Sequence, residues 1–245
     1  TTKAGLTACR KNHIKHVFAT MWGDDGAECS IFTALLGMQL YSEYNYAETV
    51  DQHHLEDMFK ICTGYDAEAF SVFNIDDFGN VCKEHNATVS KQVFYSDVLL
   101  GLFDKNLAQL DLKTHYGSIL QKFDKIKPQQ GLEYLFAYQR QLVTLLYQKC
   151  KMGEEVTWAY LQHNRSKLAE LAREIRGIAD RMETLRRMAT EIWYQNNKAF
   201  GFEAFDYKLG GTQARLCSAA TRIEMYLNGD SDVIEELEEA RLYYS

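Results

Sequence analysis

Apolar residues recur at alternating spacings of three and four along the segment from Glu154 to about Asn196. This heptad-like spacing is typical of long helices that pack at a shallow angle. We expect an interruption at Gly177 or in the region of Gly153. The stripe consists of Leu168, Leu171, Ile175, Ile178, Met182, Leu185, Ala189 and Ile192.

A second stripe of the same kind runs from about Glu203 to Leu227 and ends at Asn228-Gly229, a natural helix C-cap. Two such stripes in succession predict helices that pack in an antiparallel bundle. Shorter amphipathic patterns predict helices over 3–13, 50–63, 66–73, 107–125 and 132–151. Residues 89–103 fit a helix or a strand, and their neighbours favour a helix. The acidic tail from Asp230 to Glu239 predicts a short solvated helix.

One short apolar run differs from these patterns. Val17 to Trp22 has the length and the β-branched and aromatic content of a buried strand, and a helix from Ala27 to about Tyr44 follows. Asp25 and Glu28 fit a capping box, which leaves Asp24 without a capping role at the carboxyl end of the strand, where parallel α/β proteins bind ligands. A single strand cannot satisfy its own backbone groups. We therefore expect the chain to be the C-terminal part of a larger α/β protein, a barrel, with the other strands upstream.

Composition narrows the function classes. The net charge of −7 over 245 residues argues against a nucleic-acid partner, and no apolar run is long enough for a membrane span. Six widely spaced cysteines without a C-x-x-C pair indicate free thiols in a reducing compartment, and no signal peptide is visible. We expect a cytoplasmic protein. Adjacent His53 and His54 would point in different directions on a helix, so we expect a solvated face and no metal or cofactor.

Two motifs together resemble glycoside hydrolase family 20. The first is Met21-Trp-Gly-Asp-Asp-Gly-Ala-Glu28 with the helix after it. The second lies between Trp193 and Arg215 and includes Phe200-Gly-Phe-Glu203 and Leu209-Gly-Gly211. The motifs lie near opposite ends of the chain and in the family's order. The resemblance is closest to bacterial β-N-acetylglucosaminidases that carry an additional C-terminal helical domain.

The resemblance implies a mainly α chain that contains the last βα unit of a (β/α)8 TIM barrel, followed by an antiparallel helical bundle. Residues 1–48 would be the end of the catalytic barrel and residues 49–245 the helical domain. Hydrolysis in the family is substrate-assisted: the substrate's 2-acetamido oxygen attacks the anomeric carbon, one carboxylate orients it, and the neighbouring glutamate is the general acid/base. The Glu56-Asp57 pair has the reversed order and a helical context. We therefore expect the catalytic Asp-Glu pair upstream and no catalytic residue on this chain.

Two substrate-binding residues follow from the resemblance. Trp22 would form part of the aromatic wall around the terminal sugar, and Asp24 would accept hydrogen bonds from its 4- and 6-hydroxyl groups. Many family members have a longer glutamate where Asp24 stands. Core packing for Trp22 and helix capping for Asp24 are the structural alternatives, and Asp25 and Glu28 are expected to be caps.

Other conspicuous residues have structural interpretations. Tyr41, Tyr44 and Tyr46 could border a glycan cleft, but core or interface packing is favoured. Glu203, Asp206 and Arg215 fall at helical spacings and are expected to form ion pairs and packing contacts within the helical domain. The Gly210-Gly211 pair is expected to allow a close helix approach.

Two functions compete at this point. The first is part of an exo-β-N-acetylhexosaminidase that acts on terminal N-acetylglucosamine, with N-acetylgalactosamine as a further substrate, and whose partner is the upstream barrel segment of the same enzyme. The second is a non-catalytic helical module for dimerisation or partner binding. The apolar stripes suit a homodimer but also fill the cores of ordinary bundles. An assay of this chain by itself on a chromogenic β-N-acetylglucosaminide separates the two.

Overall fold

The computed structural model describes residues 2–21, 28–47, 49–78, 88–127 and 129–243. These residues form helices and irregular segments, and none of them lies in a strand. The chain divides into two compact units: unit 1 is Thr1–Asn74 with Ile126–Phe136, and unit 2 is Ile75–Lys125 with Ala137–Ser245. No helix among the described residues is long and apolar enough to cross a membrane.

Unit 1 is a set of short helices around a cluster of aromatic rings. Its elements are α1 (Thr2–Lys11), η1 (Ile31–Ala34), α2 (Leu35–Tyr46), α3 (Gln52–Thr63), α4 (Ala67–Phe70) and η2 (Ser71–Phe73). The Phe70 ring meets Phe59 at 5.0 Å, Phe73 at 5.3 Å and Phe136 at 5.7 Å between centroids. These edge-on contacts are the preferred geometry for aromatic pairs and form the core of this unit.

Local sequence signals explain two of these helices. The Asp51 side chain accepts a hydrogen bond from the His54 backbone N–H at 3.0 Å, and Gly64 ends α3 in the left-handed conformation (φ 79°). The α1 helix contacts α2 through Arg10, which donates to the carbonyls of Tyr44 and Ala47 at the end of α2. A cation at the C-terminal carbonyls of a helix satisfies groups that the helix leaves unpaired.

The predicted strand is not formed over its described part. Residues 17–21 are irregular, and the Phe18 side chain is 87% exposed. Trp22 lies outside the described residues. The run has strand-like residues, but no described segment pairs with it, and an unpaired strand is not stable in water. The helix predicted from Ala27 to Tyr44 is observed as η1 followed by α2, and Ala27 itself lies outside the described residues.

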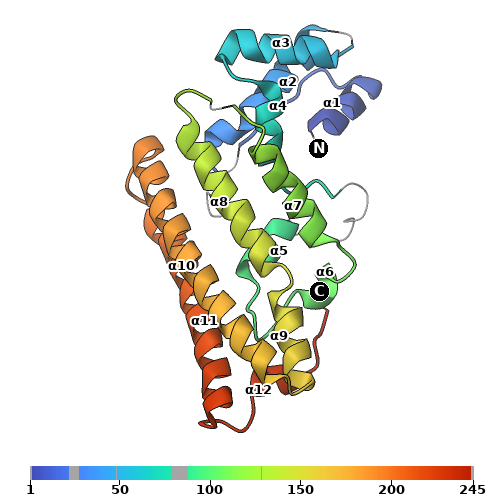
Figure 1. The fold of residues 1–245 in the computed structure, drawn as a ribbon. Helices are drawn as coiled ribbons and strands as arrows, with labels where there is room; N and C mark the ends of the chain where they lie inside the picture. The colour runs from blue at the N-terminus through green and yellow to red at the C-terminus, as the bar shows by residue number, and fades with distance from the viewer. Residues whose placement is uncertain (1, 22–27, 48, 79–87, 128, 244–245) are drawn as a thin grey trace. The chain divides into compact units, whose positions relative to one another are not determined.

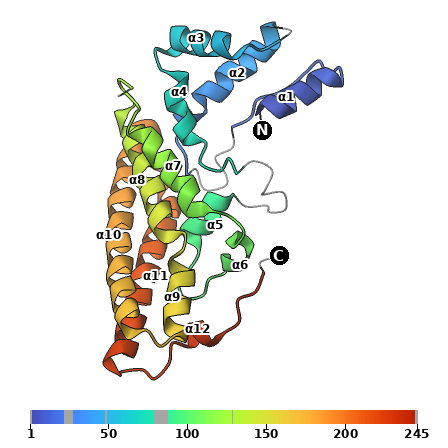
Figure 2. The same cartoon turned by 45° about the vertical axis from the view of Figure 1, so that its right-hand side comes forward.

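Unit 2 is a helical bundle that contains the two longest helices. Its elements are α5 (Val89–Tyr95), α6 (Asp104–Leu107), α7 (Leu112–Phe123), the greater part of α8 (Glu133–Lys149), α9 (Met152–Leu161), α10 (Arg165–Asn196), α11 (Phe202–Asn228) and α12 (Glu235–Glu238). Figures 1 and 2 show α10 and α11 running side by side in opposite directions. Seven of the eight predicted stripe residues of α10, all except Ile192, are buried. The heptad stripe is therefore the core seam of this hairpin.

The interruption in the long pattern lies elsewhere than predicted. Gly177 is inside α10 and Gly153 inside α9, whereas the chain turns between Leu161 and Arg165. His163 takes a left-handed conformation there (φ 51°), and the Asn164 side chain caps α10 by accepting a hydrogen bond from the Lys167 backbone N–H at 3.1 Å. Because asparagine both caps helices and favours turns, Asn164 was the local signal for this break.

Two further predictions need correction. Only the first part of 89–103 is helical, as α5, and an irregular segment over 96–103 follows it. The tail helix α12 is not solvated all round, because Leu237 and the preceding Ile234 are buried.

The predicted C-cap at Gly229 is confirmed, with φ 83°. The described cysteines, Cys9, Cys29, Cys62, Cys150 and Cys217, are free thiols as predicted.

Candidate functional site

The two predicted sugar-binding residues, Trp22 and Asp24, lie outside the described residues, as does Asp25. Their roles stay predictions. The sequence favours core or interface packing for Tyr44 and Tyr46. Tyr46 is 90% exposed, whereas the Tyr44 ring packs under the Arg10 guanidinium at 4.6 Å. His53 and His54 are both exposed, and no group of three or more metal-binding side chains occurs among the described residues.

The ion pairs expected from the second motif are present. Asp206 accepts a hydrogen bond from Arg186 Nη1 at 2.7 Å, and Arg215 Nε donates to Asp97 Oδ2 at 2.7 Å. Glu203 instead accepts from the Gly201 backbone N–H at 2.8 Å, next to the start of α11. The expected close approach at Gly210-Gly211 is wrong, because a Cβ at either position would meet nothing within 4 Å. These helical glycines have no packing partner that requires them.

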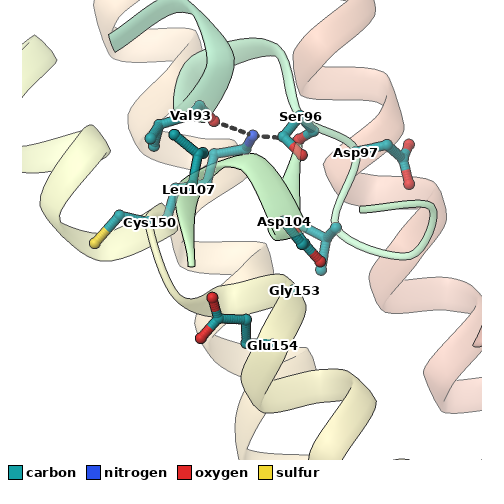
Figure 3. Close-up of a pocket in the computed structure, with 10 residues that line it drawn as sticks. Val93, Ser96, Asp97, Asp104, Leu107, Cys150, Gly153 and Glu154 are labelled. Carbon is teal, nitrogen blue, oxygen red and sulfur yellow. Dashed lines mark hydrogen bonds between the residues drawn. The ribbon is translucent and has the colours of Figure 1, made fainter. Parts of the chain in front are cut away.

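The most unusual polar group in unit 2 is the buried side chain of Lys149, at the end of α8. It is 5% exposed, and its Nζ donates to the carbonyls of Val93 (2.8 Å), Phe94 (2.9 Å) and Ser96. Figure 3 draws the bonds to Val93 and Ser96. Val93 and Phe94 lie in the last turn of α5 and Ser96 is its C-cap, so their carbonyls have no partner further along the helix, and the lysine caps that end.

The charge of the Lys149 side chain changes close to neutral pH. Burial lowers its pKa from 10.5 to about 7, and the nearby carboxylates of Asp97 and Asp104 counteract part of that effect. An ammonium group has three N–H donors, and the three carbonyls match them one for one. A neutral amine would lose one of these bonds. The geometry therefore favours the charged form below neutral pH.

Asp97 connects this lysine region to α11. Its Oδ1 accepts hydrogen bonds from the backbone N–H groups of Leu99 (2.9 Å) and Leu100 (3.1 Å), while Oδ2 accepts from Arg215. Burial raises the pKa of Asp97, but the bonds from Arg215, Leu100 and Leu99 together outweigh burial and hold the pKa below its usual value. The carboxylate thus stays ionised and fixes the 96–103 segment on α11.

Asp104 completes the polar lining beside the lysine. The Arg241 guanidinium lies 3.5 Å from its carboxylate, and both side chains are largely buried. Burial raises the pKa of Asp104 despite Arg241, and the nearby Glu154 adds to that rise. Figure 3 shows Asp104 and Glu154 beside Gly153 on this wall. Gly101 is needed here: its φ is +57°, and a Cβ would lie 2.6 Å from Arg241 Nε.

Comparison with known families decides the assignment. The sequence model described as Glycoside Hydrolase 20C C-terminal domain matches residues 70–245, which is more than half of the chain. The chain belongs to this family. No curated protein matches it. The predicted resemblance to the C-terminal part of a glycoside hydrolase family 20 enzyme is confirmed, and the helical bundle is the part of the fold that is shown.

Of the two sequence motifs, the match to the family contains only the second. It begins at Phe70, so it contains the 193–215 motif and lies wholly after the 21–28 motif. In this glycoside hydrolase 20C domain, the 193–215 motif spans the turn between α10 and α11 and the first half of α11. It ends at Arg215, which binds the Asp97 carboxylate. The second motif is therefore an element of the helical domain.

Sequence reasoning missed Lys149, Asp97, Asp104 and Arg241. A lysine in the last turn of an amphipathic helix normally suggests a solvated end. The only local signal was the segment after α5, where Ser96 and Asp97 interrupt the apolar run of 89–103. Cys150 beside the lysine is not a reactive nucleophile, because burial raises the pKa of its thiol to about 11.

Proposed function

We propose that this chain is the C-terminal portion of an exo-β-N-acetylhexosaminidase that removes terminal β-linked N-acetylglucosamine, with N-acetylgalactosamine as a further substrate. The observation that carries the proposal is the family match over residues 70–245. The Trp22-Gly-Asp24 motif near the start of the chain agrees with it. The division into a barrel end over 1–48 and a helical domain over 49–245 is part of the proposal.

The chemistry follows the family's substrate-assisted, retaining mechanism. The substrate's own 2-acetamido oxygen attacks the anomeric carbon, and an Asp-Glu pair upstream of this chain orients the acetamido group and transfers the proton. Trp22 contributes a flat apolar face to the sugar ring, and Asp24 accepts hydrogen bonds from the 4- and 6-hydroxyl groups. This chain supplies substrate contacts, not the reacting groups.

Exposed apolar side chains near residues 14–38 support an upstream partner. Phe18 is 87% exposed, Ile31 56%, Ile14 53%, Met21 50% and Met38 48%. So many large apolar side chains in one short stretch usually indicate a surface that another polypeptide covers. A preceding barrel segment of the same enzyme is the occupant that the proposed function requires.

The first test is an assay of this chain by itself on a chromogenic β-N-acetylglucosaminide. We expect no turnover, and activity only when the upstream barrel is supplied. Robust hydrolysis by the isolated chain would show that the catalytic pair has been placed wrongly.

The second test separates Asp24 from its neighbour in the active, barrel-containing enzyme. Asp24→Ala removes a charged acceptor for two hydroxyl groups, so kcat/KM should fall by about 10- to 100-fold. Asp25→Ala is the matched control and should cost about 1 kcal/mol of helix stability with little effect on kcat/KM. Equal, small kinetic effects of both changes would remove Asp24 from the sugar site.

A dimerisation or partner-binding module is the second candidate, and exposed aromatic residues around the α10–α11 turn favour it. Phe200 is 91% exposed, Tyr207 80% and Tyr194 57%. Sedimentation of the chain over a range of concentrations measures self-association directly. A monomer at all concentrations would leave this candidate without support.

A further inference from the structure

A groove lies between the residues that follow α5 and one face of α11. It has a volume of about 260 Å³. Because drug-sized ligands occupy about 300–1,000 Å³, this space suits one small ring. The α5 side contributes Tyr95, Ser96, Asp97 and Val98, with Lys149 from α8, and the α11 side contributes Tyr207, Lys208, Gly211, Thr212, Arg215 and Leu216.

Three α11 residues in this groove are spaced four apart and so share one helix face. Tyr207 presents an aromatic ring that is 80% exposed. Gly211 leaves open space, since a Cβ there would meet nothing within 4 Å. A glycine inside a helix costs about 1 kcal/mol relative to alanine, and no packing contact explains this one. An occupant of the groove would explain it, because a side chain at residue 211 would take up the space.

Arg215 supplies unused hydrogen-bond donors at the third of these positions. Its Nε binds Asp97 at 2.7 Å, and the side chain is 52% exposed. Its two terminal amino groups make no hydrogen bond to the described part of the chain. Asp97 in turn uses both carboxylate oxygens on Arg215 and two backbone N–H groups, so it holds the guanidinium in one orientation. A guanidinium fixed in this way is well suited to bind a carboxylate with two parallel bonds.

Ser96, which lines the groove from the α5 side, has an unsatisfied polar atom beneath its surface. Its hydroxyl oxygen is buried and has no hydrogen-bond partner among the described residues. A buried hydroxyl group without a partner is unfavourable, and buried polar groups in proteins are almost always paired.

The charges of the groove indicate the sign of the ligand. Arg215 and Lys208 line it from α11 and Lys149 from α8, Asp97 lines it from the α5 side, and the Asp104 carboxylate lies near Lys149. Glu236, an acid close enough to act on Arg215, pairs with Arg222 at 3.4 Å. The terminal amino groups of Arg215, which Asp97 leaves unused, favour an anionic ligand over a cationic one. The aromatic residue and the open helix face favour a ring over a simple inorganic anion.

We propose that this groove binds a carboxylate-bearing monosaccharide of the uronic acid class. The sugar ring would lie against Tyr207 and over Gly211, and its carboxylate would accept hydrogen bonds from the terminal amino groups of Arg215. The proposal goes beyond the hydrolase function and does not depend on it.

Titration of the full chain with glucuronate, followed by calorimetry, tests the proposal. Glucose has the ring without the carboxylate, acetate the carboxylate without the ring, and phosphate is a simple anion. We expect saturable glucuronate binding and at least about tenfold weaker binding of the three others, because each lacks one half of the contacts. No saturable binding of glucuronate, or equally tight binding of any comparison compound, overturns the proposal.

Two helix variants localise the binding without disturbing the core. Gly211→Leu fills the groove, and Gly210→Leu places the same side chain on a neighbouring position that does not line it. Both replace a helical glycine by a better helix former, so both should fold. Glucuronate affinity should fall about tenfold or more in Gly211→Leu and stay within about twofold in Gly210→Leu. Unchanged binding by Gly211→Leu would show that the sugar binds elsewhere.

Discussion

Helices α2 and α10 are both rich in apolar residues, yet they bury them very differently. Of the α10 side chains, nine are buried, including Leu168, Ile175 and Met182 with no exposed surface. Of the α2 side chains, only that of Glu43 is buried. Met38 in α2 is 48% exposed. Apolar content alone does not predict which helix forms the core.

The spacing of the apolar residues accounts for the difference. In α10 they follow a heptad-like period and form one stripe, which α11 covers with its own stripe. In α2 the residues Leu35, Leu36, Met38 and Leu40 point to several sides of the helix, so no single neighbour covers them. A stripe matched by a second stripe in the same chain produces a core, whereas scattered apolar residues remain partly exposed.

The two helices should differ most in the free energy of unfolding that is lost when a methionine side chain is removed. Met182→Ala in α10 removes a side chain with no exposed surface and should lower the free energy of unfolding by about 2–5 kcal/mol. Met38→Ala makes the same chemical change on the half-exposed face of α2 and should cost below about 1 kcal/mol. Urea unfolding followed by circular dichroism measures both.

The pair is matched, because both residues are inside helices and alanine is a better helix former than methionine. The difference therefore reports burial alone. If Met38→Ala costs as much as Met182→Ala, then α2 is covered in solution by another surface, and the contrast between the helices is wrong for the isolated chain.

The sequence predicted helices well where their pattern was periodic or their ends were marked. The 203–227 prediction matches α11 within one residue at each end, because Asn228-Gly229 marks its C-terminus and the stripe marks its body. The predictions were poorer where tertiary contacts decide. Residues 96–103 are irregular because Asp97 binds Arg215, 118 residues further along the chain, and spacing cannot show such a contact.

The polar region around Lys149 was not predictable for the same physical reason. Its three acceptors are backbone carbonyls from residues 93–96, and any sequence has carbonyls. Only the fold shows that they converge on one lysine. The motif residues Asp206 and Arg215 were predicted to form ion pairs, but their partners, Arg186 and Asp97, lie on other elements and carried no signal.

The second prediction compares the buried Lys149 of unit 2 with the less buried Lys151. Lys149 has its pKa lowered to about 7 in the folded protein, against 10.5 when unfolded. Between these two values the unfolded chain binds a proton that the folded chain lacks, so the free energy of unfolding should rise with pH. The rise is at most about 1.4 kcal/mol per pH unit, and it should vanish below about pH 7. Urea unfolding at pH 7, 8 and 9 measures it.

Lys149→Met should remove this pH dependence, since methionine fills a similar volume without a titrating group. Lys151→Met is the control: Lys151 pairs with Glu154 at 3.0 Å in a more exposed setting, and its loss should leave the slope unchanged. If Lys149→Met does not fold, the pH dependence of the free energy of unfolding of the wild-type chain still tests the prediction. A free energy of unfolding that is flat or falls from pH 7 to 9 would show that Lys149 keeps its proton throughout.

The smallest expected effect tests whether the two helices belong to one cooperative unit. Gly177 in α10 and Gly37 in α2 both have open space where a Cβ would be. Gly177→Ala should raise the free energy of unfolding of α10 by about 0.5–1 kcal/mol, because alanine loses less backbone entropy on entering a helix. Gly37→Ala should protect α2 by a similar amount and leave α10 unchanged. Hydrogen exchange of peptides from each helix measures the two effects separately. If Gly37→Ala slows exchange in α10 as much as in α2, the two units unfold together. The contrast between α2 and α10 would then describe how they pack but not how they unfold.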